Sequence, residues 1–264
     1  MLGKKKKLIS CLVVFALLLS ATVAYASYTQ YWGSSTSYTA GSNKARHASY
    51  MAVANSDVSA RTVVRNDTGH ALSPGWLGVR PIAYFSNGEM AKRGDWEYSD
   101  ARISGMDVPL PIYNYKSYLY SKGETALWNG NGYTRRKTTP SPNAKAESAR
   151  LAIEGIQINS SGETFGSELA ATSYEDRPDL IAAVGVDGIS GYVRKTDLDG
   201  DMPNSPEEAV KLMHSPEYLY TARVVPLYDS EGKKVIGEFE IGSARNGCGV
   251  QIVMENGVLV EKRQ

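Results

Sequence analysis

The stretch Leu180–Arg194, LIAAVGVDGISGYVR, is the clearest fold signal in the chain. It opens with a continuous apolar run bounded by a turn, which is typical of a buried strand. Asp187-Gly188 is a hairpin dipeptide, and Gly191–Arg194 is the expected returning strand. This stretch therefore predicts an antiparallel hairpin whose apolar side lies in a core.

Short strand candidates bounded by Gly, Pro, Asn and Asp turns continue on both sides of this hairpin. Trp76–Phe85 predicts a strand interrupted by Pro81, and residues 250–261 predict a second hairpin. This pattern favours a mainly β fold made of two small β domains, each sandwich- or barrel-like.

One short helix is expected in the C-terminal domain. Ser205 has the position of a cap, Pro206 that of the first helical residue, and Glu208 completes a capping box. Pro216 is expected to lie beyond the end of this helix.

Residues 1–26 have the organisation of a secretory signal peptide. Lys4–Lys7 is basic, Leu8–Leu19 is apolar, and Ala24-Tyr25-Ala26 places small residues where a signal peptidase reads them. We expect cleavage after Ala26. The alternatives are a leader retained as a membrane anchor and lipid attachment at Cys11.

The remaining chain is divided by composition. We predict a Tyr/Trp-rich β domain over 27–133, a polar linker over 134–146 and a β module over 147–264. The linker begins with the basic run Arg135-Arg136-Lys137, which is suited to contact with an anionic cell-wall polymer. A solvated linker is the simpler interpretation of the same residues.

Charge and cysteine content exclude several classes of protein. The leader holds four Lys and no acid, so residues 27–264 carry 25 basic against 28 acidic side chains, a net charge of −3. This does not favour a nucleic-acid partner. Cys248 is alone once the leader is removed, so no intrachain disulfide is expected, as is usual for exported Gram-positive proteins.

No metal or cofactor is predicted. Asp197, Asp199, Asp201 and Glu208 follow the ligand spacing of a calcium loop, but Met202 stands where the loop needs Gly.

His47, His70 and His214 are available as partners for a nucleophilic Cys248. However, Cys248 lies between two predicted hairpins and does not begin a predicted helix, so we interpret it as a structural thiol.

A cluster of acids lies beside two tryptophans and has the residue types of a glycosidase cleft, namely Glu89, Asp95, Glu97 and Asp100. A solvated loop explains them equally, and we assign no catalytic residue. Aromatic and cationic side chains on strands are suited to sugar or protein contact. The binding candidates are Trp76, Trp96, Tyr192 and Arg194.

Motifs between residues 163 and 241 resemble a module of uncharacterised exported proteins of Gram-positive bacteria. They are GYVRxxDL from Gly191, PEEA from Pro206 and PLYDxxGKxVIG from Pro226. Gly188–Leu198 also resembles the closing strands of bacterial SH3-like domains, which bind cell-wall peptide in several enzymes. The resemblance implies export and contact with the wall.

The sequence therefore predicts a secreted or cell-wall-associated protein without enzymatic activity, which binds a wall polymer, a glycan or a surface protein. A membrane contact is expected only through an uncleaved leader. Two alternatives stay open: a glycan- or wall-acting hydrolase that uses residues 76–100, and a secreted antagonistic factor of the bacteriocin type.

Overall fold

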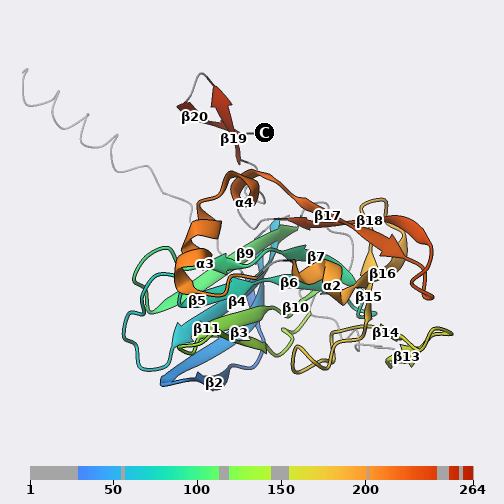
Figure 1. The fold of residues 1–264 in the computed structure, drawn as a ribbon, viewed down its shortest axis with the longest axis horizontal. Coiled ribbons are helices and arrows are strands. Elements are labelled where there is room, and N and C mark those ends of the chain that lie inside the picture. Colours follow the sequence, from blue (N-terminus) through green and yellow to red (C-terminus); the bar gives the residue numbers. More distant parts are fainter. Residues whose placement is uncertain are drawn as a thin grey trace, which may run out of the picture.

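The computed structural model describes residues 29–54, 57–112, 119–143, 155–200, 202–242, 250–255 and 258–263. Within these ranges the protein is mainly β with little helix, as the sequence predicts (Figure 1). No helix among them has the length and apolar character needed to cross a membrane. The predicted leader and Cys248 lie outside the described residues.

The described strands form three larger sheets and a C-terminal hairpin. The first sheet has the order β1-β3-β4-β9, with β2 also paired to β3, and comprises β1 (Thr29–Trp32), β2 (Thr36–Ala40), β3 (Asn43–Ala54), β4 (Asp57–Asn66) and β9 (Gly105–Ile112). The second has the order β12-β11-β5-β8 and comprises β12 (Tyr133–Lys137), β11 (Glu124–Trp128), β5 (Leu77–Arg80) and β8 (Glu97–Tyr98).

The third sheet has nine strands in the order β10-β6-β7-β18-β17-β16-β15-β14-β13. These are β10 (Leu119–Ser121), β6 (Ile82–Phe85), β7 (Met90–Gly94), β18 (Val235–Gly242), β17 (Arg223–Tyr228), β16 (Ser190–Arg194), β15 (Leu180–Val184), β14 (Thr164–Gly166) and β13 (Gln157–Ile158). The pair β15–β16 is the hairpin predicted at 180–194. The second predicted hairpin is present as β19 (Val250–Glu255) and β20 (Val258–Arg263).

The described helices are short: α2 (Lys195–Asp199), α3 (Pro206–Met213) and α4 (Pro216–Tyr220). In α3, the predicted helix, the Ser205 hydroxyl accepts a hydrogen bond from the Glu208 backbone N–H at 3.2 Å. The prediction of a single helix is wrong, because α2 and α4 are also present. Ser215 caps α4 by accepting from the Tyr218 N–H, so the Ser-Pro start signal occurs twice in succession.

The nine-stranded sheet takes strands from both sides of the predicted linker. Strands β6, β7 and β10 precede the linker, and β13 to β18 follow it. β7 pairs in parallel with both β15 and β18. Residues 134–137, predicted as linker, belong to strand β12, so that part of the linker prediction is wrong.

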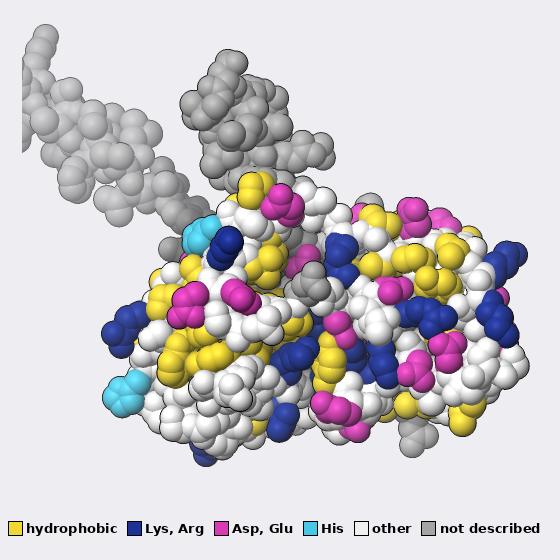
Figure 2. All heavy atoms as spheres, in the orientation of Figure 1, with side chains coloured by type: hydrophobic (Ala, Val, Ile, Leu, Met, Phe, Trp, Pro, Cys, Tyr) yellow, Lys and Arg dark blue, Asp and Glu magenta, His cyan; other side chains and the backbone are white. Residues whose placement is uncertain are grey.

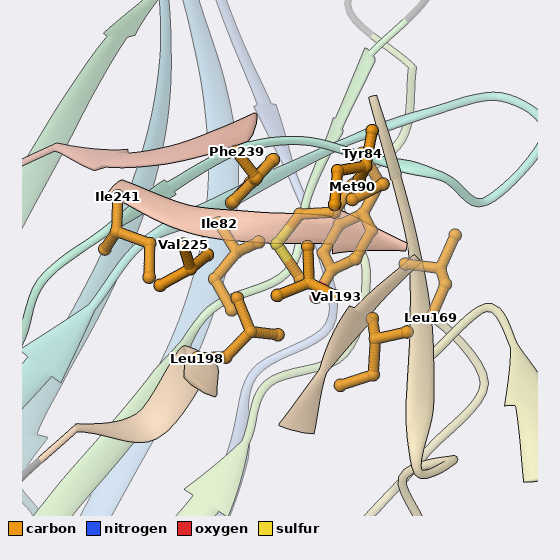
Figure 3. Packing of buried hydrophobic residues seen from close by; sticks show 12 residues of the cluster. Ile82, Tyr84, Met90, Leu169, Val193, Leu198, Val225, Phe239 and Ile241 are labelled. Atoms are coloured by element: carbon orange, nitrogen blue, oxygen red, sulfur yellow. The ribbon is translucent and has the colours of Figure 1, made fainter. Parts of the chain in front are cut away.

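The largest core cluster crosses the same boundary (Figure 3). Ile82, Tyr84 and Met90 from β6 and β7 are fully buried with Val193 and Phe239 from the C-terminal strands. Because apolar burial is the main favourable term in folding, the C-terminal strands depend on β6 and β7 for part of their stability.

Two antiparallel segments, β5–β6 and β10–β11, each pass from the second sheet into the third and bend where the sheets meet. Only Pro81 separates β5 from β6, and only Lys122-Gly123 separates β10 from β11. β5 pairs with β11, and β6 pairs with β10. Gly123 touches the first sheet at this bend, since a Cβ built on it would lie 2.0 Å from Thr62 Oγ1. Only glycine fits without displacing its neighbours.

We expect Gly123→Ala to lower the free energy of unfolding by about 1–3 kcal/mol, because the added methyl group overlaps tightly packed atoms. Chemical denaturation followed by tryptophan fluorescence measures this loss. Gly155→Ala is the matched control, because nothing lies within 4 Å of a Cβ built there. Equal stability of the two variants would contradict the steric explanation.

Candidate functional site

A network of buried charged side chains lies at this bend. We call it the charged junction, and it consists of Arg80, Arg93, Lys122, Glu124, Lys137, Glu168, Arg177 and Asp199. All are buried except Asp199, whose side chain is 17% exposed. The members come from β5, β7, β11, β12, α2 and the loops between strands. The junction therefore ties together segments that are distant in the sequence.

Two glutamates form the centre of the charged junction. Glu124 Oε2 accepts a hydrogen bond from Arg80 Nε at 2.8 Å, and its Oε1 lies 3.1 Å from Lys137 Nζ. Glu168 Oε2 accepts from the same Lys137 Nζ at 2.8 Å, and its Oε1 accepts from Arg93 Nη1 at 3.3 Å. Lys137 thus bridges the two carboxylates.

Asp199, at the end of α2, extends the junction toward the surface. Its carboxylate accepts from Arg177 Nη2 at 2.6 Å and from Arg93 Nη2 at 3.2 Å. The Tyr84 hydroxyl donates to Glu168 Oε1 at 2.8 Å from the main core cluster. The junction is therefore continuous with the apolar core on one side.

The surrounding cations keep these carboxylates ionised. Burial by itself would raise the pKa of Glu168, but Lys137, Arg93 and Arg177 outweigh it and lower the pKa to about 2. In the same way Arg80 and Lys137 hold the pKa of Glu124 well below its usual range despite burial. Both glutamates are charged at neutral pH.

Cations nevertheless outnumber carboxylates in the charged junction, by five to three among the described residues. Asp95 and Arg223 border it and add one charge of each sign. Lys122 donates to the carbonyls of Leu169 and Ala171, each at 2.6 Å. Burial and, to a smaller extent, repulsion by Lys137 lower its pKa to about 8. The junction thus has a surplus of positive charge.

The charged junction reaches the surface at a shallow depression. We call it the basic depression, and it is lined by Glu124, Arg135, Arg136, Lys137 and Tyr174. The Tyr174 ring lies between two guanidinium groups, with the Arg135 carbon 4.4 Å and the Arg177 carbon 3.8 Å from its centroid. Figure 2 shows Lys and Arg side chains gathered near the middle of the face on which α2 lies.

Strand register explains why these side chains meet. Glu124 lies opposite Arg80 on one side and Lys137 on the other, so the three form one row across the second sheet. Ala126 lies opposite Arg135 in the next row on the same face. The basic run predicted as a linker is held in place because it is an edge strand of this sheet.

Aromatic side chains continue this face away from the charges. Trp96 and Tyr98 stack with their ring centroids 6.0 Å apart, and Tyr98 lies 5.1 Å from Tyr133. Helices α3 and α4 cover them through Met213 and Tyr218. Trp96 Nε1 and the Tyr98 hydroxyl are buried without a hydrogen-bond partner among the described residues.

The four predicted binding residues lie in two separate places. Trp96 is 4% exposed and lies under the guanidinium group of Arg80, whose carbon is 4.6 Å from the ring centroid. Trp76 is half-buried against the cluster between the first and second sheets. Tyr192 and Arg194 lie instead on β16 of the nine-stranded sheet.

Tyr192 and Arg194 both have local partners on their strand face. Tyr192 packs edge-on against Phe165 with ring centroids 5.4 Å apart. Arg194 forms an ion pair with Glu163 and donates to the Gly232 carbonyl at 2.7 Å. The structure therefore does not bring the β16 pair together with the tryptophans.

The calcium hypothesis gains no geometric support, and Glu89 and Asp95 are too far apart to act on one bond, so the hydrolase hypothesis now depends on Glu97 and Asp100. Glu89 and Asp95 lie beyond opposite ends of β7, about 20 Å apart along an extended strand. Asp199, central to the calcium spacing, is paired with arginines. The described residues contain no group of three or more His, Cys, Asp or Glu side chains arranged to hold a metal ion.

Sequence reasoning missed most of the charged junction. Its members are spread from residue 80 to residue 199 and share no local motif. The available signal was a charged residue inside a strand of otherwise apolar or small residues, such as Arg80 after Val79 or Glu124 before Thr125. Such positions are rarely buried unless a partner of opposite charge faces them.

Comparisons with protein families, curated proteins and solved structures found no match. The resemblance of residues 163–241 to an exported module therefore stays a prediction.

A buried histidine lies near the basic depression. His47 Nδ1 is 2.7 Å from Thr125 Oγ1, and the side chain is almost fully buried between the first and second sheets. Burial and, to a smaller extent, the charge of Arg136 lower the pKa of His47 to about 4. The imidazole is therefore neutral in the folded protein at pH 6.

We expect Glu168→Gln to lower the free energy of unfolding at pH 7 by about 3–5 kcal/mol, because it leaves buried cations without their carboxylate. Thermal or chemical denaturation measures the loss. Glu238→Gln, a neutralisation of an exposed carboxylate on β18, is the control and should change little. A stability of Glu168→Gln close to that of the wild type would contradict a stabilising role for this carboxylate.

We also expect stability to fall as the pH drops from about 6.5 to about 4, because the unfolded His47 then binds a proton that the folded one excludes. The contribution is up to about 3 kcal/mol. Unfolding free energy measured against pH should decrease less steeply in His47→Gln over this window. The exposed His70→Gln is the control, and an unchanged slope in His47→Gln would disprove the assignment.

Proposed function

We propose that this chain is an exported, non-enzymatic binding protein that acts at or outside the cell wall and binds an anionic wall polymer at the basic depression. One observation carries the proposal: five cations face three carboxylates in the charged junction, two of whose members, Glu124 and Lys137, line the depression. The predicted signal peptide supports the location outside the cell.

The surplus of positive charge favours an anionic ligand. Charges held away from water are unfavourable unless a counter-charge is near. The rim adds Arg135 and Arg136, while Glu175 of the neighbouring loop offers a single carboxylate to Arg136. A phosphate or carboxylate group at the depression would therefore complete a charge balance that the chain leaves incomplete.

The rim is also ordered before any ligand binds. Arg135 stacks on Tyr174 and belongs to strand β12, so its guanidinium group loses little freedom on binding. A planar guanidinium group gives two parallel hydrogen bonds to a phosphate or carboxylate. These features support recognition of an anionic group at this place.

Residues 27–264 carry a net charge of −3, so the protein as a whole does not attract an anionic polymer. Attraction is expected only locally, at the basic depression. An ionic contact between exposed groups weakens as salt is added, because dissolved ions compete for both partners and screen attraction beyond about 8 Å. Binding should therefore weaken as salt is added, in proportion to the ionic contacts made.

We expect Arg135→Ala/Arg136→Ala to weaken retention on isolated cell walls at least about tenfold, because each charged hydrogen bond contributes about 1.5–3 kcal/mol. Co-sedimentation of residues 27–264 with walls, before and after chemical removal of their anionic polymer, measures this. Lys233→Ala/Lys234→Ala removes the same charge from the exposed β17–β18 turn and should keep full retention.

Three results would contradict the proposal. They are equal retention on walls stripped of the anionic polymer, equal loss in both double variants, and no retention of the wild type. Circular dichroism of each variant shows whether the fold is intact.

A further inference from the structure

An exposed tryptophan ends a stack of side chains on the first sheet. Trp32 is 47% exposed, and its ring stacks on Tyr50 with centroids 4.0 Å apart and planes 20° apart. The guanidinium carbon of Arg61 lies 5.7 Å from the centroid of the same Tyr50 ring. Tyr50 is thus held between an indole and a cation.

Register places the stack on the outer face of the sheet. Trp32 lies opposite Tyr50, and Tyr50 lies opposite Arg61, so the three form one row across β1, β3 and β4. The adjoining row, with Met51 and Ala60, faces the core. Side chains of neighbouring rows point to opposite faces of a sheet, so the row of Trp32 points away from the core.

One face of the Trp32 ring is left open by this arrangement. Tyr50 covers the other face, and β1 is the outermost strand at this end of the sheet. The indole N–H donates to Gln30 Oε1 at 2.9 Å, which fixes the ring and leaves the amide nitrogen of the exposed Gln30 as a donor beside it. The ring is therefore exposed, oriented and flanked by a polar group.

The stack is braced from the far side. Asp107 on β9 accepts from the Tyr50 hydroxyl at 2.6 Å and from Arg61 Nε at 3.1 Å. A large exposed aromatic ring held rigid in this way loses little conformational entropy when a ligand covers it. The side chain of Trp32 takes no part in the core, because the buried cluster lies on the opposite face of the sheet.

The geometry points to Trp32 and Gln30 as a carbohydrate-binding platform for an uncharged pyranose chain, separate from the basic depression. The face of an indole ring is electron-rich, and the axial C–H bonds on one face of a pyranose are electron-poor. The Gln30 amide beside the ring is suited to a sugar hydroxyl. A nucleobase also stacks on indole, but the Asp107 carboxylate, two rows along on the same face, disfavours a phosphate backbone.

Affinity electrophoresis in gels containing glycol chitin or hydroxyethyl cellulose, two soluble β-1,4-linked polymers, tests the platform on residues 27–264. We expect at least one of them to retard the wild type. Trp32→Leu, which keeps apolar area but loses the ring, should raise the apparent Kd about tenfold, whereas Trp32→Phe should retain part of the binding. Trp128→Phe, on a half-buried tryptophan of β11, is the control and should bind as the wild type does.

The outcomes separate this platform from the basic depression. Arg135→Ala/Arg136→Ala should be retarded as strongly as the wild type. Loss of retardation in that double variant but not in Trp32→Leu would overturn the assignment to Trp32. So would a wild type that neither polymer retards, or one retarded more strongly by oligothymidine. Thermal melting of Trp32→Leu and Trp32→Phe identifies a variant that has lost its fold.

Discussion

Glu168 is an ionised carboxylate with no exposed surface, and the fold around it depends on its neutralisation. Lys137, Arg93 and Arg177 reach it from β12, β7 and the loop before β15. If any of these segments moved away, a charge would be left in a region of low dielectric, at a cost of several kcal/mol. Charges of this kind add little net stability over a well-packed apolar core, but they disfavour alternative packings strongly. The charged junction is thus best understood as a constraint on which segments meet.

The position of the charged junction fits this interpretation. Two strand segments pass from the second sheet into the third at Pro81 and at Lys122-Gly123, and strand pairing is interrupted there. Interrupted pairing leaves backbone groups that need partners, and Gly123 N–H donates to the hydroxyls of Ser49 and Thr138. Lys122 in turn satisfies two carbonyls of the loop that carries Leu169. Local polar contacts and buried charges therefore stabilise the same bend, which explains how a nine-stranded sheet is assembled from strands on both sides of residue 143.

The sequence predicted what is local and missed what is distant. The 180–194 hairpin and the α3 cap depend on neighbouring residues, and both are confirmed. The run Arg135–Lys137 was interpreted as a linker, because its composition is polar and a Pro follows, yet pairing with β11 makes it a strand. No local pattern indicates that Lys137 faces two carboxylates or that β7 pairs with β15 and β18. Trp96 is predicted as a binding residue because aromatic side chains on strand faces suit sugar or protein contact. Its burial under Arg80 depends on strand register, which composition does not reveal.

Among the described residues, the charged junction holds more cations than carboxylates. Glu124, Glu168 and Asp199 are paired with Arg80, Arg93 and Arg177. Lys137 lies between Glu124 and Glu168 and has no carboxylate of its own. Lys122 donates to backbone carbonyl oxygens instead of to a carboxylate. Repulsion between the two lysines is unfavourable in the isolated protein and would be relieved by an anion near Lys137 at the basic depression. A bound anion should therefore raise the pKa of Lys122 toward its ordinary value, which links the buried network to the state of the surface.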